Sequence, residues 1–417
     1  MTAGADARPE LQKLMADGVR AGEAADAVDG IVPTAVIEPE TVDDVVELLR
    51  GAAGSGLSVV PRGAGTKLGW GNPPRSLDLV LDVRRLDRVL EYNPGDLVVR
   101  AQAGRTLAAL QEQLAEKGQV LALDPPERGA TLGGVVAANA SGPRRLRYGT
   151  VRDLIIGVTV VLADGTLAHA GGKVVKNVAG YDLGKLFTGS LGTLGVLVEV
   201  IFRLHPLAAF TRTVQLPYDG GPAAAELVSS ILQSPLVPSA LELVRPRGGD
   251  GQLVVLFEGV EPAVAAQVES TRRLRADATV SDGVPAGFGA HPFGAGEVGV
   301  KISAEPAALP AVLHALDVVD QEHGLSAAVT AHAGTGVLWA GWPGPADPAT
   351  VAAAVEQLRA AMARYDGSVV VVAAPAEVKA RLDVWGPVGD ALPLMRRVKE
   401  RFDPDGRLSP GRFVGGI

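Results

Sequence analysis

The sequence predicts an α+β protein whose first half mixes strands and helices and whose second half is an antiparallel sheet covered by helices. Three observations support this class. Strand and helix patterns alternate between residues 41 and 204, a β-α-β-β-α order occurs twice between 211 and 374, and three glycine-rich segments follow strands of the first half. The 417 residues are 47% hydrophobic and 21% charged, so the chain is expected to fold around more than one buried core.

The composition excludes several classes of protein. With 39 Lys and Arg against 47 Asp and Glu, the net charge of −8 provides no basic field for nucleic acid or anionic lipid. The absence of cysteine excludes disulfides, thiolate metal sites, cysteine-ligated iron–sulfur clusters and cysteinyl flavin. No secretory leader and no membrane span of ~18 apolar residues is recognisable. The expected location is therefore the cytoplasm, and redox chemistry would need a bound cofactor.

The elements of the first half follow from local patterns. Residues 1–28 are expected to form an N-terminal extension. A helix should begin after Thr41, which can cap it, because Val45, Leu48 and Leu49 then form one apolar face. The remaining expectations are strands over 57–61, 77–83, 97–101 and 193–204, a helix over 106–118, a functional loop over 129–149, and a hairpin that begins with 155–162 and turns at an Asp-Gly pair.

The second half predicts two ferredoxin-like halves that share one antiparallel sheet. Pro206 marks the expected boundary before it. The expected strands cover 211–218, 239–244, 252–258, 298–303, 326–332, 335–341 and 368–374, and the expected helices cover 222–233, 261–275, 305–319, 348–364 and, in the C-terminal tail, 392–402.

The first glycine-rich segment, residues 61–69, combines exposed backbone N–H groups with a hydroxyl and two cations, as a diphosphate requires. It has neither the G-x-G-x-x-G spacing of a nicotinamide fold nor the ending of a Walker loop. Taken alone, it is equally consistent with an ordinary turn after a strand.

Two further segments strengthen the case for a ligand. Residues 130–143 are small enough for close backbone approach, and Thr131, Asn139 and Ser141 can hydrogen-bond a ligand, although helix packing also selects such residues. The third segment covers 171–182 and 188–195. The sequence leaves two interpretations open for Arg144, Arg145 and Arg147. They belong to a solvated loop, or they contact a phosphate or a partner protein. Three such segments within about 140 residues favour one elongated ligand held in several places.

Five motifs in order resemble the vanillyl-alcohol-oxidase-type, or PCMH-type, FAD-binding family, and most closely the FAD-binding subunits of glycolate oxidase (glycolate dehydrogenase). They are PRGAGTKLG, ATLGGVVAANASGP, RYGTVRDLIIGVTVVLADG, KNVAGYDLGKLFTGSLGTLGVLVEV and FDPDGRLSPGRF. The resemblance implies a PCMH-type FAD-binding domain of two α/β subdomains over 29–207, a cap domain over 208–384, and a segment 385–417 that returns to the FAD domain.

The resemblance also implies the cofactor and its ligands. The FAD diphosphate would contact Pro61, Arg62, Gly63, Ala64, Gly65, Thr66, Lys67 and Leu68. The ribityl chain and isoalloxazine would contact Thr131, Leu132, Gly133, Gly134, Ala138, Ser141 and Gly142, with Tyr148, Gly149 and Val196 completing the pocket. Covalent members of the family place a histidine beside the first loop, where this chain has none, so the FAD is expected to be noncovalent.

Oxidation of a 2-hydroxy acid needs a base for the hydroxyl proton and a cation for the carboxylate. His332 is the candidate base, because AHAGTGVLW resembles the HAGDGNLH segment of catalytic relatives; a structural role at a strand end is the alternative. Trp339 replaces the second histidine of that segment, so no metal site is expected. Arg381 is the candidate for the carboxylate, with an ordinary surface position as its alternative.

The resemblance implies a subunit of a glycolate oxidase complex that also contains a catalytic FAD subunit and an iron–sulfur subunit. Any association of this chain with the inner membrane would be peripheral and would depend on these partners. The chain would oxidise glycolate to glyoxylate or, given the missing histidine, relay electrons. Two alternatives stay open: a self-sufficient D-lactate-type FAD dehydrogenase and a noncatalytic assembly subunit. The intact glycine segments argue against the second alternative, because a chain without a ligand has no need for them.

Overall fold

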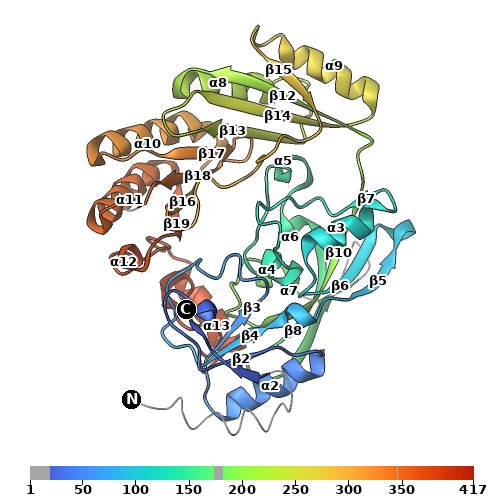
Figure 1. Ribbon diagram of the computed structural model, residues 1–417, viewed down its shortest axis with the longest axis vertical. Helices are drawn as coiled ribbons and strands as arrows, with labels where there is room; N and C mark the ends of the chain where they lie inside the picture. Colours follow the sequence, from blue (N-terminus) through green and yellow to red (C-terminus); the bar gives the residue numbers. More distant parts are fainter. Residues whose placement is uncertain (1–18, 173–181, 345) are drawn as a thin grey trace.

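A computed structural model describes residues 19–172, 182–344 and 346–417. It contains two larger sheets in the first half of the chain and one eight-stranded sheet in the second half, which lies above them in Figure 1. The mixed architecture confirms the predicted fold class. Short 3₁₀ turns occur at Ala24–Asp26, Val83–Arg85, Pro94–Asp96, Pro306–Ala308, Ala363–Tyr365 and Val414–Gly416.

The first sheet has the order β1-β2-β4-β3, formed by Val19–Ala21, Ala35–Ile37, Leu79–Asp82 and Val59–Arg62. Strands β2, β4 and β3 are parallel. Helix α2 (Val42–Gly54) begins as predicted, since the Thr41 side chain accepts a hydrogen bond from the Asp44 N–H and Val45, Leu48 and Leu49 are buried. Strand β3 ends at Arg62, so the first glycine segment leaves the sheet at the carboxyl ends of its parallel strands, where such sheets bind ligands.

Part of the expected extension joins this sheet. Strand β1 pairs with β2, and the Asp26 carboxylate, which is only 3% exposed, forms ion pairs with Arg20 at 2.5 Å and with Arg62 at 2.9 Å. The Arg62 guanidinium also contacts Asp82 at 2.9 Å. Residues 19–28 therefore help to hold the strand that precedes the first glycine segment.

The second sheet is antiparallel, with the order β5-β6-β10-β8-β9. Its strands are Val89–Asn93, Val98–Gln102, Val196–Arg203, Ile155–Val161 and Leu167–Gly171, and the predicted hairpin of β8 and β9 is confirmed. Helices α3 (Leu107–Ala115), α5 (Arg145–Tyr148), α6 (Val151–Leu154) and α7 (Leu183–Phe187) lie around it, and β7 (Gln119–Val120) pairs with β11 (His205–Pro206).

The prediction of a continuous loop over 129–149 was wrong. Residues Leu132–Ala137 form helix α4, which Thr131 caps by accepting a hydrogen bond from the Gly134 N–H. Leu132, Val135 and Val136 are buried in the core of the second sheet. The glycines and alanines between them weaken the apolar periodicity from which a helix is normally recognised.

The eight-stranded sheet confirms the two ferredoxin-like halves, which join between β13 and β17. The first half is β12 (Phe210–Tyr218), α8 (Gly220–Leu232), β13 (Ala240–Arg245), β14 (Gly251–Gly259), α9 (Glu261–Arg272) and β15 (Thr279–Asp282). The second is β16 (Val298–Ser303), α10 (Leu309–His323), β17 (Ala328–His332), β18 (Val337–Trp342), α11 (Pro348–Met362) and β19 (Ser368–Ala373). Strand β15 was not predicted, because it is a fully exposed edge strand without an apolar face.

The two faces of this sheet differ in chemistry. Side chains alternate along a strand, and Val300, Ile302 and Leu338 are buried in the core formed with the helices. Their neighbours Lys301 and Trp339, which are paired across β16 and β18, therefore point to the other face, toward the first half of the chain. His332 and its cross-strand partner Glu242 lie on that same face by the same alternation.

The chain after β19 forms α12 (Ala376–Lys379) and α13 (Leu392–Phe402) and runs back to the first sheet (Figure 1). The Val59 N–H donates to the Arg407 carbonyl, and the Ser409 N–H donates to the Val59 carbonyl, each at 2.9 Å. No helix in the described parts of the chain is long and apolar enough to cross a membrane.

Lys399 on α13 is expected to be important for stability. Its buried ammonium donates to Asp403 at 2.6 Å, and also to the Thr193 carbonyl at 2.8 Å and the Leu408 carbonyl at 2.9 Å. The variant Lys399→Met leaves Asp403 buried and without its cation, at a cost of about 3 kcal/mol in the free energy of unfolding. Thermal unfolding should show a clear loss for this variant, whereas Arg396→Met, at an exposed position of the same helix, should unfold like the unmodified chain.

Candidate active site

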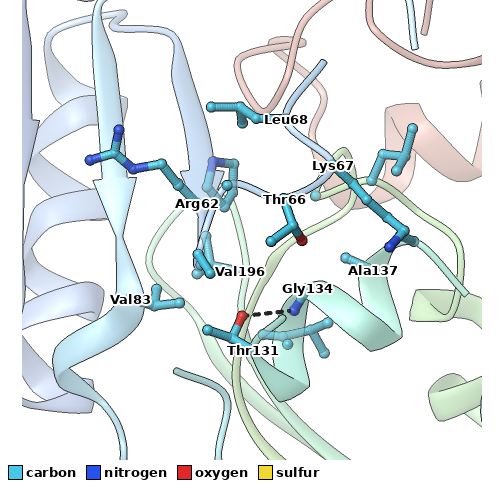
Figure 2. Close-up of a pocket in the computed structure, with 18 of the residues that line it drawn as sticks. Arg62, Thr66, Lys67, Leu68, Val83, Thr131, Gly134, Ala137 and Val196 are labelled. Carbon is cyan, nitrogen blue, oxygen red and sulfur yellow. Dashed lines mark hydrogen bonds between the residues drawn. The ribbon is translucent and has the colours of Figure 1, made fainter. Parts of the chain in front are cut away.

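The three glycine-rich segments meet in one cleft of about 780 Å³ between the first two sheets (Figure 2). We call it the glycine cleft. Its lining residues are Pro61, Arg62, Gly63, Ala64, Gly65, Thr66, Lys67, Leu68, Val83, Thr131, Gly133, Gly134, Ala137, Ala138, Leu191, Gly192, Gly195, Val196, Leu197 and Arg412. The prediction that distant glycine segments gather around one elongated space agrees with this lining.

Two glycines are required by the way these segments pack. A Cβ atom on Gly63 would lie 2.0 Å from Thr131 Oγ1, at the start of α4. Gly192 has a φ of +72°, and a Cβ atom there would lie 3.2 Å from the Pro61 ring. Side chains at either position would force the first segment away from the second or the third.

The first segment offers unpaired backbone N–H groups to a ligand. The N–H groups of residues 64–67 donate no hydrogen bond to any residue that the structure describes. The Arg62 guanidinium points away from Thr66 (Figure 2) and is occupied by Asp26 and Asp82. Free, adjacent N–H groups of this kind bind the oxygens of a diphosphate, so the segment fits the diphosphate of FAD.

A second pocket of about 270 Å³ continues the cleft, since Lys67 and Ala138 line both. We call it the cationic pocket. Its lining residues are Lys67, Trp70, Pro126, Ala138, Asn139, Ala140, Ser141, Arg145, His291, Lys301 and Trp339. The first half of the chain thus supplies one wall, and the face of the eight-stranded sheet opposite its helices supplies the other.

Two partly buried cations face this pocket without a carboxylate partner among the described residues. Arg145 donates to the Ser141 carbonyl at 2.7 Å, and Lys301 lies with its ammonium 5.6 Å from the centre of the Trp339 ring. Burial lowers the pKa of Lys301 to about 8, helped by the charge of Arg145. Burial also lowers the pKa of Arg145, although the charges of Asp124 and Glu242 oppose that shift. Such cations have lost part of their hydration, and a bound anion compensates for that loss.

Polar atoms without partners lie at the same place. Asn139 Oδ1 and Ser141 Oγ are buried and have no hydrogen-bond partner in the described chain. Buried polar atoms in folded proteins are normally paired. The pocket therefore contains unused hydrogen-bonding capacity beside its two cations, as expected of a site for a small polar ligand.

Glu127 joins Lys67 to His291 at the edge of this pocket. The carboxylate forms an ion pair with Lys67, and its Oε1 lies 3.1 Å from His291 Nε2. Burial raises the pKa of Glu127, but the hydrogen bond from His291 and the charge of Lys67 outweigh it and lower the pKa to about 2. Glu127 is therefore an anion at any physiological pH.

Several predicted cofactor residues lie elsewhere. Leu132 is buried in the core, and a Cβ atom on Gly142 would meet the Asp124 carbonyl at 2.0 Å, so these two residues support α4 and the loop after it. Tyr148 packs against His205 with ring centres 5.0 Å apart and lines a different pocket. Gly149 has a φ of +81° and packs against Asp153. These four residues were expected at the cofactor only through the family resemblance. Residues 176–181 of the KNVAGYD motif lie outside the described residues.

The two residues predicted for catalysis do not line the cationic pocket. His332 is 4% exposed and its Nδ1 lies 2.6 Å from Glu242 Oε2, one strand away from Trp339. Arg381 is exposed, after helix α12. Within the described chain, no group of three His, Asp or Glu side chains is arranged to hold a metal ion.

The three arginines of α5 and its start have separate roles. Arg144 forms an ion pair with Glu258 on β14 at 2.7 Å, and Arg147 donates to the Glu258 carbonyl at 2.8 Å. These contacts hold the first half of the chain against the eight-stranded sheet. Arg145 alone turns into the cationic pocket.

Sequence reasoning missed Trp70, Glu127, His291 and Lys301. Trp70, Glu127 and His291 lie on connecting segments without a motif, and no local pattern distinguishes them. Lys301 could have been recognised from the sequence, because it interrupts the apolar strand VGVKIS. A strand that is covered on both faces is normally hydrophobic throughout.

Comparisons with known proteins agree with this geometry. The family model of the FAD binding domain matches residues 33–171, and that of the C-terminal domain of FAD linked oxidases matches residues 385–413. The glycolate oxidase subunit GlcD of Bacillus subtilis is 37% identical over 214 residues, 51% of this chain and 46% of that protein. The glycolate oxidase subunit GlcE of Escherichia coli is 34% identical over 227 residues, 54% of this chain and 63% of that protein. The chain thus spans about half the length of the curated relatives it matches.

A solved structure extends the likeness over the whole chain. P-cresol methylhydroxylase with substrate bound has a TM-score of 0.77 at 16% identity, covering 98% of this chain and 96% of that one. At this identity the likeness concerns the fold alone, and it confirms the PCMH-type fold. The chain therefore carries an FAD binding domain over residues 33–171 and the C-terminal segment of FAD linked oxidases over residues 385–413, and FAD is its cofactor. Over about half of its length it is similar to hydroxy-acid dehydrogenases and glycolate oxidase subunits.

Proposed function

We propose that this chain oxidises a small 2-hydroxy acid, with FAD in the glycine cleft and the substrate carboxylate in the cationic pocket. The observation that carries the proposal is the pair Arg145 and Lys301. Both are partly buried, neither has a carboxylate partner in the described chain, and both face a pocket of about 270 Å³ that adjoins the cleft.

The cofactor contacts in this proposal include residues predicted for the diphosphate and residues predicted for the ribityl chain and isoalloxazine. Backbone groups of residues 64–67 would bind the diphosphate, and Thr131, Gly133, Gly134 and Val196 would adjoin the rest of the cofactor. Lys67 and Ala138 line both spaces, so the flavin ring would lie at their junction. None of the six histidines, all of which the structure describes, lines the glycine cleft, which supports noncovalent binding. In this assignment 29–207 and 385–417 form the FAD domain and 208–384 the cap.

Bound FAD would supply the acceptor for the two electrons of the oxidation. The chain itself would orient the substrate. Arg145 and Lys301 would hold the carboxylate through charge-assisted hydrogen bonds, which are the strong ones in a buried site. Ser141 and Asn139 offer polar atoms for the substrate oxygen, and the rings of Trp70 and Trp339, 5.9 Å apart, would exclude water.

We also propose that the chain works as a subunit of a glycolate oxidase-type complex. Two of its relatives are named as subunits of glycolate oxidase. A chain without cysteine cannot carry a cysteine-ligated iron–sulfur cluster, so electrons leaving its FAD would pass to a partner that does. A catalytic FAD subunit and an iron–sulfur subunit are the partners expected.

Anaerobic reduction tests the proposed function. The chain is purified alone, its bound FAD is measured by absorbance, and glycolate, D-lactate, L-lactate or D-2-hydroxyglutarate is added without oxygen. Bleaching of the flavin by at least one small 2-hydroxy acid is expected. If dithionite bleaches the flavin but none of these acids does, the result would contradict oxidation by this chain and favour electron relay.

The charge of Lys301 predicts how substrate binding depends on pH. An ammonium with a pKa of about 8 is charged below that pH and neutral above it, so affinity for a carboxylate should fall as the pH rises through 8. Each further pH unit should weaken binding up to about tenfold, until the other anchors alone hold the ligand. Calorimetric titration with oxalate at pH 7 and 9.5 checks this. Lys301→Arg should remove the pH dependence and keep the affinity, and an unchanged pH dependence in Lys301→Met would contradict the assignment.

A further inference from the structure

We propose that His291 accepts the hydroxyl proton of the substrate and that Glu127 and Lys67 prepare it for this step. The inference rests on the proposed function, because it names the proton acceptor of the reaction proposed there. It assigns the role for which the resemblance offered His332 as a candidate to a histidine that no motif identifies.

The contact with Glu127 determines which nitrogen of His291 is free. An ionised carboxylate only accepts hydrogen bonds, so the proton of the neutral imidazole lies on Nε2, 3.1 Å from Glu127 Oε1. Lys67 pairs with the other oxygen of the same carboxylate. The lone pair is then on Nδ1, which is buried and has no hydrogen-bond partner among the described residues. A base held in one tautomer by a carboxylate is the arrangement used in proton-abstracting dyads.

The ring is fixed in place at the wall of the cationic pocket. It stacks on Phe293 with the centres 4.9 Å apart and the planes 8° apart, and it meets the Trp339 ring edge-on at 4.4 Å. The charged groups that face the same space are Glu127 and Lys67 from the first half of the chain, Arg145 from α5 and Lys301 from β16. The Glu127 carboxylate would stabilise the imidazolium that forms once the ring has accepted the substrate's proton.

His332 lacks these properties. The nitrogen that contacts a carboxylate there is Nδ1, at 2.6 Å from Glu242, and its ring does not line the cationic pocket. Both histidines lie near a carboxylate, but only His291 combines that contact with a place on the pocket wall.

The step balances in protons and electrons. The O–H bond of the 2-hydroxy acid breaks and its proton passes to His291 Nδ1. The C–H bond at the same carbon would break as well, and FAD, when bound, would supply the acceptor for its hydride and both electrons. The substrate becomes the 2-oxo acid, and the imidazolium later returns its proton to water.

The test compares His291→Ala with His314→Ala, a matched change at an exposed position of α10. Stopped-flow reduction of the flavin by the best substrate should slow by roughly 100-fold or more in His291→Ala, the usual effect of removing a general base. Added imidazole should restore part of the rate. Oxalate affinity, measured by calorimetry, should change less than about twofold, since Arg145 and Lys301 remain. His314→Ala should match the unmodified chain in all three measurements.

A second measurement does not depend on turnover or on a variant that folds well. Histidine ¹⁵N resonances of the unmodified protein, with the His291 signal identified by its loss in His291→Gln, should show a proton on Nε2 and none on Nδ1 at neutral pH. A proton on Nδ1 would overturn the inference. An unchanged rate of flavin reduction in His291→Ala would also overturn it. The same holds if the rate is slow, added imidazole does not restore it and oxalate binding is lost as well. If no 2-hydroxy acid reduces the flavin of the unmodified chain, the proposed function itself fails.

Discussion

Replacing Gly63 by alanine should give a folded protein that purifies with little or no flavin. The added Cβ atom would lie 2.0 Å from Thr131 Oγ1, well inside van der Waals contact, so either the first glycine segment or the start of α4 must move. Both line the glycine cleft, and the backbone N–H groups of residues 64–67 would no longer converge on the diphosphate. We expect the dissociation constant for FAD to rise at least tenfold, which corresponds to about 1.4 kcal/mol.

The control is Gly69→Ala. Gly69 belongs to the same glycine-rich stretch, but an added Cβ atom there would meet nothing within 4 Å. The ratio of flavin to protein after purification, and calorimetric titration of the apoprotein with FAD, should separate the two variants. If Gly63→Ala retains full flavin with unchanged affinity, the first segment does not lie against the cofactor.

Replacing Arg145 by methionine should abolish useful substrate binding while the flavin remains bound. Arg145 lines the cationic pocket but not the glycine cleft, so its loss should affect the two ligands differently. Truncating a buried cation that pairs with a carboxylate costs about 2–5 kcal/mol, so oxalate affinity should fall by roughly 100-fold or more. Calorimetry with oxalate and the absorbance of bound flavin measure the two effects.

Arg152→Met serves as the matched control, since Arg152 is exposed on the neighbouring helix α6. It should bind oxalate and FAD like the unmodified chain. Oxalate affinity within twofold of normal in Arg145→Met would show that the carboxylate binds elsewhere.

The sequence predicted the strands and helices of the eight-stranded sheet almost completely, because their periodicities are strong. Residues such as Val300 and Ile302 alternate with polar neighbours, and helices α10 and α11 carry regular apolar faces. Strand β15 escaped because an exposed edge strand needs no apolar face. Helix α4 escaped because the small residues that allow close approach also erase the apolar pattern.

The site could be predicted only where it depends on backbone chemistry. Glycine-rich segments mark places where a chain must approach a ligand or another segment, and residues 61–68 indeed line the glycine cleft. The cationic pocket depends instead on side chains from distant positions, Arg145 and Lys301, which meet only when the eight-stranded sheet packs on the first half. His291 and Glu127, separated by 164 positions, have no relation that a pattern along the chain can show.

The structure of the chain with bound FAD and oxalate tests the central claim most directly. The account predicts the diphosphate against residues 64–67, the flavin ring beside Lys67 and Ala138, and oxalate between Arg145 and Lys301. A flavin ring that lies away from the cationic pocket, or oxalate bound outside it, would contradict the account.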